Sequence, residues 1–119
     1  MECVLVVAHG SRARETEDAF DAVIDMVREL LPETHIVSTY MQLSDRTLEQ
    51  TVAELVRDGV SDIRIVPYFL FTGVHIKQDI PEMIKRFGEK YPAINIDLGQ
   101  PLGVDRRLAE IVVDRIRQI

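Results

Sequence analysis

The chain has 119 residues, of which 46% are apolar, and its 14 Lys and Arg against 20 Asp and Glu give a formal charge of −6. This length fits a single domain over residues 1–119 that builds one core. The acidic balance argues against a general nucleic-acid binder, which would carry a basic face, and against attraction to anionic membranes by bulk charge.

The N-terminus and the cysteine content point to a cytoplasmic protein. Cys3 is the one cysteine, which excludes an internal disulfide, and its place at the start of an apolar run predicts a small buried hydrophobe. The first residues lack the basic region, apolar stretch and cleavage site of a secretory signal. No apolar run approaches the roughly 20 residues of a membrane-spanning helix, so we expect a soluble cytoplasmic protein.

Strand and helix patterns alternate along the first half of the chain. Residues 3–8 form a continuous apolar run that predicts a strand, and apolar residues at helical spacing over 19–31 predict a helix that Pro32 ends. Residues 35–41 alternate in polarity and predict a second strand. Ser44 or Asp45 can cap a second helix, with Gly59 just past its end.

The second half repeats this alternation. A third strand lies within residues 63–71, and residues 72–78 follow as a loop. Asp79 and Glu82 resemble a capping box, with Pro81 in the first turn of a third helix. Residues 94–98 predict a fourth strand, and a last helix carries Leu108, Ile111, Val112, Ile116 and Ile119.

Strands that alternate with helices predict an α/β fold with a parallel sheet and right-handed crossovers. The first and third strands are the most continuously apolar, which places them at the centre with helices on both faces. The second and fourth strands alternate in polarity, which places them at the edges. The resulting order is 2-1-3-4, and ligands in such sheets bind beyond the carboxyl ends of the strands where the order reverses, here between the first and third strands.

Two histidines fall at that reversal. His9 directly follows the first strand, and His75 lies in the segment after the third, whereas His35 starts the second strand at the opposite end of the sheet. Each histidine alone could be a structural hydrogen-bonding residue. Together, two neutral imidazoles suit Co²⁺, Ni²⁺, Fe²⁺ or Zn²⁺, and two protein ligands leave coordination positions open for transient metal handling. A histidine can also accept a proton near neutral pH.

Residues beside the histidines could hold an anionic, flat ligand. The backbone N–H groups of Gly10 and Ser11 could bind an anion at a helix N-terminus, although a tight turn with a helix cap explains them equally well. The apolar stretch 69–74 could form a wall of the site or ordinary core. Positive charge at the same rim could come from side chains that are otherwise solvated: Arg12, Arg14, Arg46 and Lys77.

Nucleotide-cofactor and serine-hydrolase functions lack support in the sequence. The chain contains no Gly-x-Gly-x-x-Gly, no Gly-x-x-x-x-Gly-Lys and no Gly-x-Ser-x-Gly motif.

Two segments resemble a known family. Val-Ala-His-Gly-Ser-Arg at 7–12, and Val-Pro-Tyr-Phe-Leu-Phe-Thr-Gly-Val-His at 66–75 with Asp-Ile-Pro at 79–81, resemble the small single-domain sirohydrochlorin cobaltochelatases and their nickel- and iron-inserting relatives. The similarity runs through essentially the whole chain, and the second motif is long and quite specific.

The resemblance implies an ATP-independent class II chelatase with a three-layer flavodoxin-like fold and no organic cofactor. Such an enzyme inserts Co²⁺, or alternatively Ni²⁺ or Fe²⁺, into sirohydrochlorin for cobalamin, sirohaem or nickel-tetrapyrrole biosynthesis. It implies that His9 and His75 bind the metal and that His9 also accepts a proton. We expect substrate contacts from Ser11, Arg12, Asp45, Leu70, Phe71, Thr72, Gly73, Val74 and His75. Because a tetrapyrrole is large relative to one such domain, we expect a homodimer.

The segment after the second strand departs from the family pattern. Gln42 stands where the family usually has a glutamate, and Arg46 stands where it has a proline. A glutamine can donate a hydrogen bond but cannot take a proton, so this protein could be slower or differ in metal choice.

Two rival functions follow from the same residues. A non-catalytic tetrapyrrole or metal carrier would need no acid at position 42. A hydrolase of the histidine-phosphatase kind also places His-Gly after its first strand, but that chemistry needs an arginine just before the histidine, where this chain has Ala8.

Overall fold

The computed structural model describes residues 1–71 and 73–119, without the side chains of Val74 and His75. Strands and helices alternate in the order β1 (Glu2–Ala8), α1 (Arg14–Leu30), β2 (Ile36–Tyr40), α2 (Leu48–Arg57), β3 (Asp62–Pro67), α3 (Val74–Lys90), β4 (Asn95–Leu98) and α4 (Arg106–Arg117). The alternation confirms the α/β class expected from the sequence.

All four strands are parallel and lie in the order β2-β1-β3-β4, as predicted. β1 pairs along its length with both neighbours, so that Val6 lies between Ser38 of β2 and Val66 of β3. The carboxyl ends of β1 and β3 therefore lie side by side, which is the place predicted for the site.

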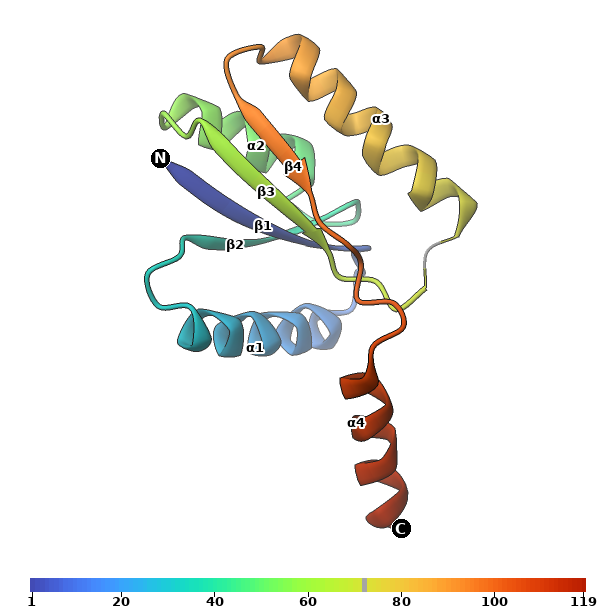
Figure 1. Ribbon diagram of the computed structural model, residues 1–119. Helices are drawn as coiled ribbons and strands as arrows, with labels where there is room; N and C mark the ends of the chain where they lie inside the picture. Colours follow the sequence, from blue (N-terminus) through green and yellow to red (C-terminus); the bar gives the residue numbers. More distant parts are fainter. Residues whose placement is uncertain (72) are drawn as a thin grey trace.

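Helices cover both faces of the sheet, as Figure 1 shows. Alternate residues of the apolar β1 run divide between the faces: Leu5 packs with α2 and α3, while Val6 packs with α1. The larger cluster joins Leu48 and Val52 of α2 to Phe87 of α3. The smaller cluster, on the α1 side, joins Phe20 and Ile24 of α1 to side chains of β1 and β2. This explains why β1 has no polar alternation.

The predicted starts of two helices were wrong. α2 is capped by Thr47, whose side chain accepts from the Gln50 N–H while Gln50 reaches back to the Thr47 N–H, so neither Ser44 nor Asp45 is the cap. α3 begins at Val74 and not at Asp79, so most of the predicted 72–78 loop is helical.

Pro81 consequently lies inside α3 and not in its first turn. The proline has no N–H to donate to the carbonyl of Lys77, so the helical hydrogen-bond ladder is interrupted there.

α4 leaves the body of the protein as an arm (Figure 1). None of its residues, all of which the structure describes, is buried. The Cα radius of gyration is 15.3 Å, larger than the roughly 13.5 Å expected for a compact chain of this length. The last helix, predicted from its apolar spacing, is therefore present but does not join the core of its own chain.

None of the helices described here is long and apolar enough to cross a membrane.

Candidate functional site: the carboxyl ends of β1 and β3

His9 lies in the turn between β1 and α1, with its side chain exposed. The segment after β2 runs alongside this turn: the Met41 N–H donates to the Ala8 carbonyl at 2.8 Å, and the Gln42 N–H donates to the His9 carbonyl at 3.1 Å. On the other side, the Tyr68 N–H donates to the Val7 carbonyl at 2.7 Å. Backbone hydrogen bonds thus fix His9 between the loops that follow β2 and β3.

Gly10 makes this close approach possible. Its φ is +104°, a backbone conformation that favours glycine, and a Cβ built on it would lie 1.8 Å from the Gln42 carbonyl oxygen. Glycine at position 10 is therefore a steric requirement of the turn as well as part of the motif.

Phe69 supports the His9 ring. The two ring centroids lie 4.3 Å apart at an angle of 44°, and Phe69 is only 2% exposed. The Phe69 carbonyl accepts a hydrogen bond from the Gly103 N–H at 3.3 Å, which ties this residue to the segment that leads into α4. The imidazole therefore has a buried aromatic support, and its position is linked to the base of the arm.

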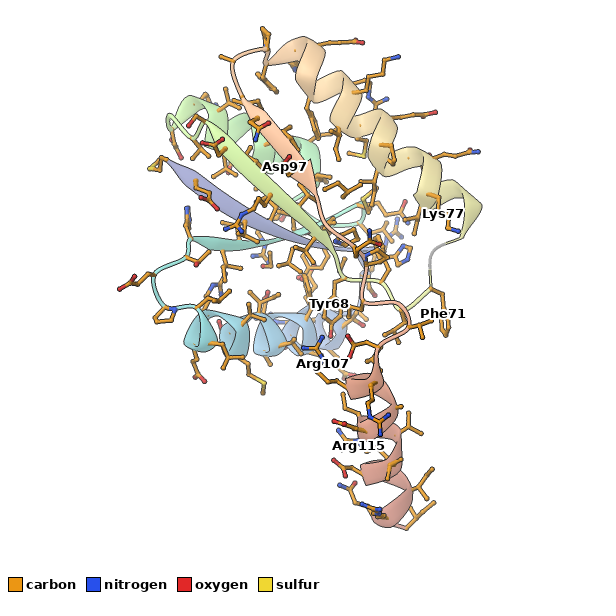
Figure 2. All side chains as sticks on the ribbon, in the orientation of Figure 1. Tyr68, Phe71, Lys77, Asp97, Arg107 and Arg115 are labelled. Carbon is orange, nitrogen blue, oxygen red and sulfur yellow. The ribbon has the colours of Figure 1, made fainter. Side chains whose placement is uncertain are left out.

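The loop after β3 exposes large apolar side chains. Leu70 is 51% exposed and Phe71 is 85% exposed, and Phe71 extends away from the body in Figure 2. Exposed aromatic side chains of this kind are typical of a surface that binds an apolar partner. Both residues were expected to face a tetrapyrrole.

The remaining residues of the expected loop open α3. Gly73 is the N-cap of this helix, and the backbones of Val74 and His75 form its first turn. Thr72 and the side chains of Val74 and His75 lie outside the described part. That the His75 imidazole lies close to the His9 imidazole therefore stays a prediction.

Ser11, Arg12 and Asp45 line one polar cleft of about 760 Å³ between the start of α1 and the loop after β2. The Ser11 Oγ accepts the Ala13 N–H at 3.0 Å, as in a helix-entry turn. The sequence did not indicate that acidic side chains of α1, such as Asp18 and Asp21, would line the same cleft. The rim therefore carries both signs of charge.

Arg46 fixes the loop that carries Asp45. Its guanidinium donates to the Ser38 Oγ at 3.2 Å, lies 3.6 Å from the Asp21 carboxylate and sits over the Tyr40 ring at 5.6 Å. Burial, followed by the negative charges of Asp21 and Glu17, raises the pKa of Tyr40, while Arg46 opposes that rise. The arginine that departs from the family pattern thus has a structural role here.

An apolar hollow of about 540 Å³ opens beside His9 on the α1 side of the sheet. Ala19, Phe20 and Val23 of α1 form one wall, and His9 and Tyr68 stand at the strand ends. Figure 2 shows Tyr68 projecting toward α1. The Tyr40 hydroxyl is buried in this region and has no hydrogen-bond partner among the described residues.

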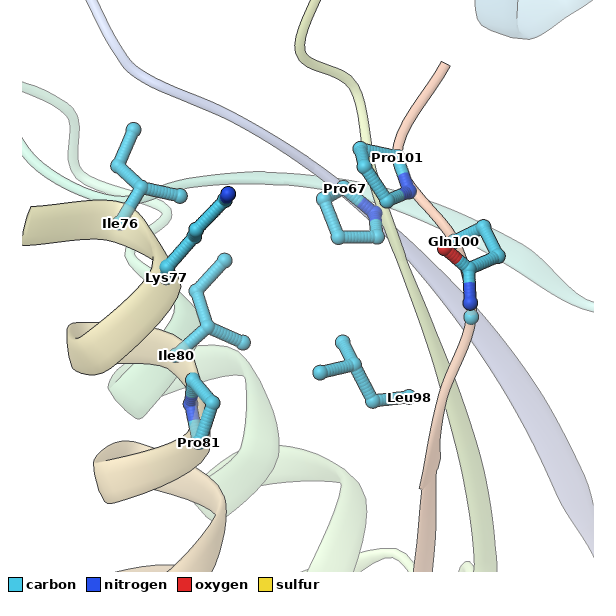
Figure 3. Close-up of a pocket in the computed structure, with 9 residues that line it drawn as sticks. Pro67, Ile76, Lys77, Ile80, Pro81, Leu98, Gln100 and Pro101 are labelled. Atoms are coloured by element: carbon cyan, nitrogen blue, oxygen red, sulfur yellow. The ribbon is translucent and has the colours of Figure 1, made fainter. Parts of the chain in front are cut away.

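A second cavity, of about 390 Å³, lies on the opposite side of the same edge. Ile76, Lys77 and Ile80 of α3 face Pro67, Leu98 and Pro101 across it, and Lys77 reaches over its mouth (Figure 3). Lys77 was expected to add positive charge at the rim, and it lies beside the carboxyl ends of β3 and β4.

Within the described side chains, no three of His, Cys, Asp or Glu come together as a metal site.

Sequence reasoning missed three features of the site: the Phe69–His9 stack, the Arg46 network and Tyr68 in the hollow. The position of Tyr68 could have been predicted, because side chains alternate between the two faces of β3 and residue 68 falls on the face that α1 covers. The other contacts join residues far apart in the chain and have no local signal.

Comparison with known proteins identifies the family of this chain. Residues 3–119 match the CbiX family. The chain belongs to the CbiX family. It is 31% identical over 138 residues to the sirohydrochlorin cobaltochelatase of Methanopyrus kandleri, and the match covers 99% of this chain and 96% of that protein. The family expected from the two motifs is therefore confirmed.

Longer relatives share the same unit. The chain is 37% identical over 118 residues to the sirohydrochlorin ferrochelatase of Priestia megaterium, of which it spans 44%. The sirohydrochlorin chelatase SirB from Bacillus subtilis subspecies spizizenii, solved in complex with cobalt, superposes with a TM-score of 0.88 and 30% identity. That match covers 99% of this chain and 50% of SirB, so the CbiX chain spans about half the length of these relatives.

Proposed function

We propose that this CbiX protein inserts a divalent metal ion into sirohydrochlorin without ATP. The observation that carries the proposal is the exposed His9 imidazole, held by backbone bonds and Phe69 at the switch point of a CbiX sheet. The relatives named for sirohydrochlorin cobaltochelatase and ferrochelatase activity support Co²⁺ or Fe²⁺ as the metal substrate. Ni²⁺ is a further candidate, because neutral imidazole binds it well.

The proposed reaction exchanges one metal ion for two pyrrole N–H protons, so charge balances when both protons leave the ring. The hydrated ion loses water molecules and binds His9 and His75 while the macrocycle lies across the edge of the sheet. Holding ring and ion together supplies much of the rate enhancement by proximity. His9 accepts at least one proton after it releases the metal, because the second nitrogen of a metal-bound neutral imidazole already carries a hydrogen. Glu15 lines the same hollow as His9 and offers a carboxylate to which the proton can pass.

Substrate contacts are assigned by the chemistry of each surface. Leu70 and Phe71 give exposed apolar area for the flat ring. Arg12 at the polar cleft and Lys77 at the second cavity give cations for its carboxylates. Ser11, Asp45, Gly73, Val74 and Thr72 complete the proposed contact set. A homodimer would give a ring of this size a second wall.

A carrier function is the second candidate, and Gln42 favours it. Its backbone N–H donates to the His9 carbonyl, so the backbones of residues 42 and 9 lie side by side, yet the Gln42 amide cannot accept a proton. A carrier given excess Co²⁺ and sirohydrochlorin would stop after one equivalent of complex per protein, whereas a chelatase would continue.

Visible absorption spectra of sirohydrochlorin mixed with Co²⁺, Ni²⁺ or Fe²⁺ test the proposal. We expect multiple turnovers with at least one metal, and losses of about 100-fold or more for His9→Ala and His75→Ala. His35→Ala is the matched control, because His35 is exposed at the other end of the sheet. Insertion that neither active-site variant slows would refute the proposal.

A further inference from the structure

The loop between β2 and α2 runs beside the His9 turn in a strained conformation. Leu43 has a φ of +57°, in the left-handed region that leucine rarely adopts because its Cβ crowds the backbone. The Leu43 side chain is 46% exposed, so packing in the core does not offset this strain. A strained backbone persists only where the surrounding contacts impose it. The loop is therefore held by its neighbours.

A closed network of three side chains holds the end of this loop. The Arg46 guanidinium donates to the Ser38 Oγ at 3.2 Å, the Ser38 hydroxyl donates to the Asp21 carboxylate at 3.2 Å, and that carboxylate lies 3.6 Å from the guanidinium. Each group takes the part its chemistry allows, because an arginine only donates, a carboxylate only accepts and a hydroxyl does both. Ser38 is buried, which gives the network a fixed anchor on β2. These three side chains, here called the latch, join α1 and β2 to the loop.

The backbone of Arg46 closes the same loop. The Tyr40 N–H donates to the Arg46 carbonyl at 3.1 Å, so the two ends of segment 41–45 meet at the end of β2. The Arg46 guanidinium also lies over the ring of Tyr40, which is buried. Joining the ends of so short a segment restricts the conformations open to Gln42 and Leu43.

The loop is bonded in turn to the His9 turn. The Met41 N–H donates to the Ala8 carbonyl, and the Gln42 N–H donates to the His9 carbonyl. On the other side of this contact, a Cβ on Gly10 would lie 1.8 Å from the Gln42 carbonyl oxygen, so the two segments have no room to slide past each other. A shift of residue 42 would therefore displace the backbone of His9.

Arg46 also lines the polar cleft, where its guanidinium could instead bind a carboxylate of the substrate directly. The geometry favours the latch, because the guanidinium already has the Ser38 hydroxyl and the Asp21 carboxylate as partners. A substrate carboxylate would have to displace Asp21 to reach it.

We propose that Arg46 is a positioning residue for His9: the latch holds the strained loop, and the loop holds the proposed metal ligand in the geometry needed for insertion. Reaction rates are sensitive to such geometry, since a small misplacement of a reacting group slows the chemical step. The latch is a property of the chain alone, whereas its effect on insertion rests on the proposed function.

Amide hydrogen exchange tests the latch without substrate. In Arg46→Ala and in Asp21→Asn, the Gln42 N–H should exchange at least about tenfold faster, because the loop opens more often. The Tyr68 N–H, which is bonded on the other side of the His9 turn, is the internal reference and should keep its rate. Unchanged Gln42 exchange in both variants would overturn the proposal.

Arg64→Ala is the matched control for the loss of a half-exposed arginine. Arg64 pairs with Glu2 at the amino end of β1, away from the His9 turn. This variant should keep the parental exchange rate of the Gln42 N–H and the parental rate of metal insertion. Faster Gln42 exchange in Arg64→Ala would show that the loop responds to any lost ion pair, which would contradict a specific latch.

Insertion kinetics separate the latch from direct substrate binding. Arg46→Ala and Asp21→Asn should each lower kcat about five- to tenfold with a smaller change in the KM for sirohydrochlorin, and the double variant should be no slower than Arg46→Ala. Direct binding predicts the reverse for Asp21→Asn, a lower KM with kcat kept, because the guanidinium loses its competing carboxylate. That result, or a rise in KM alone for Arg46→Ala, would refute the positioning role.

A second substitution tests the strain itself. Glycine adopts a φ of +57° without a Cβ penalty, so Leu43→Gly in the Arg46→Ala background should restore at least about half of the lost kcat and slow Gln42 exchange. Ser44→Gly in the same background is the control, because it adds flexibility without relieving strain, and it should restore neither. No recovery with Leu43→Gly, or equal recovery with both, would show that the latch does not act against this strain.

The two kinds of measurement keep the proposals apart. If the latch variants speed Gln42 exchange but insert metal at the parental rate, the positioning role of Arg46 is wrong and the chelatase proposal stands. If the parent protein inserts no metal while the latch variants still speed Gln42 exchange, the chelatase proposal is wrong and the latch stands.

Discussion

The loops after β1 and β3 flank the same site but are held in different ways. The β1–α1 turn is polar and defined by its backbone: both Ala8 and His9 carbonyls accept bonds from the loop after β2, and Gly10 takes a φ of +104°. The β3–α3 loop exposes Leu70 and Phe71, and among the described residues its fixed points are the backbones of Tyr68 and Phe69.

Under the proposed function, this difference separates two tasks. A proton acceptor and metal ligand must be held in one geometry, and a backbone-bonded turn does so at little cost in side-chain entropy. A broad apolar ring needs contact area, and exposed apolar side chains supply it. Substitutions in the first loop should therefore change the rate of insertion, and those in the second should change substrate affinity.

Gly10→Ala should have the largest effect. The new Cβ would meet the Gln42 carbonyl oxygen at 1.8 Å in a backbone conformation unfavourable to alanine. We expect a loss of roughly 2–4 kcal/mol in unfolding free energy, measured by urea denaturation, and insertion slowed about 100-fold.

Gly88→Ala is the control for that change. It lies within α3, and no described atom lies within 4 Å of its added Cβ, so it should stabilise the protein by roughly 0.5–1 kcal/mol. Equal stability of Gly10→Ala and the parent would show that the turn is not held as tightly as the contacts indicate.

Phe71→Ala should have an intermediate effect confined to binding. Because Phe71 is 85% exposed, its removal should change unfolding free energy by less than about 0.5 kcal/mol. The KM for sirohydrochlorin should rise about tenfold with kcat nearly unchanged. Leu30→Ala, at an 80% exposed residue at the other end of the molecule, should leave KM as it is; a fall in kcat alone would contradict the division between the loops.

Gln42→Glu should have the smallest effect, a gain of about two- to fivefold in insertion rate. Because the backbone of residue 42 is bonded to that of His9, the new carboxylate would add negative charge near the proposed metal ligand and could accept a proton. The gain should appear above about pH 5, where a glutamate is ionised, in rates measured across a pH series. Gln118→Glu makes the same charge change at the end of α4 and should give no gain; a slower Gln42→Glu enzyme would argue against an acidic helper at this position.

The strand order could be predicted from the sequence because the most continuously apolar strands lie at the centre of a parallel sheet. The continuous apolar runs gave central β1 and β3, and the mixed β2 and β4 gave the edges. The start of α3 was missed because its N-cap is Gly73, which has no side chain to signal a cap, while Asp79 and Glu82 imitate a capping box inside the helix. For α2, Thr47 and Gln50 carried a true capping signal that Ser44 and Asp45 obscured.

The position of His9 at the edge of the sheet could be predicted from the sequence, but the contacts that hold it could not. Strand order alone placed His9 at the switch point. The Phe69 stack and the approach of Gly10 to Gln42 depend on how three separate loops meet, which no local pattern encodes. The same holds for α4: its amphipathic sequence indicates that the helix packs against another surface, but it does not indicate where that surface lies.

The burial of the Cys3 thiol affects which side chains of the chain can bind a metal ion. Burial raises its pKa to about 11, so the thiol stays protonated near neutral pH. Thiolate is the soft ligand that would hold Co²⁺, Ni²⁺ or Fe²⁺ most firmly and invite oxidation. With its single thiol kept protonated inside the core, the chain offers a passing ion no thiolate to compete with the weaker imidazole donors.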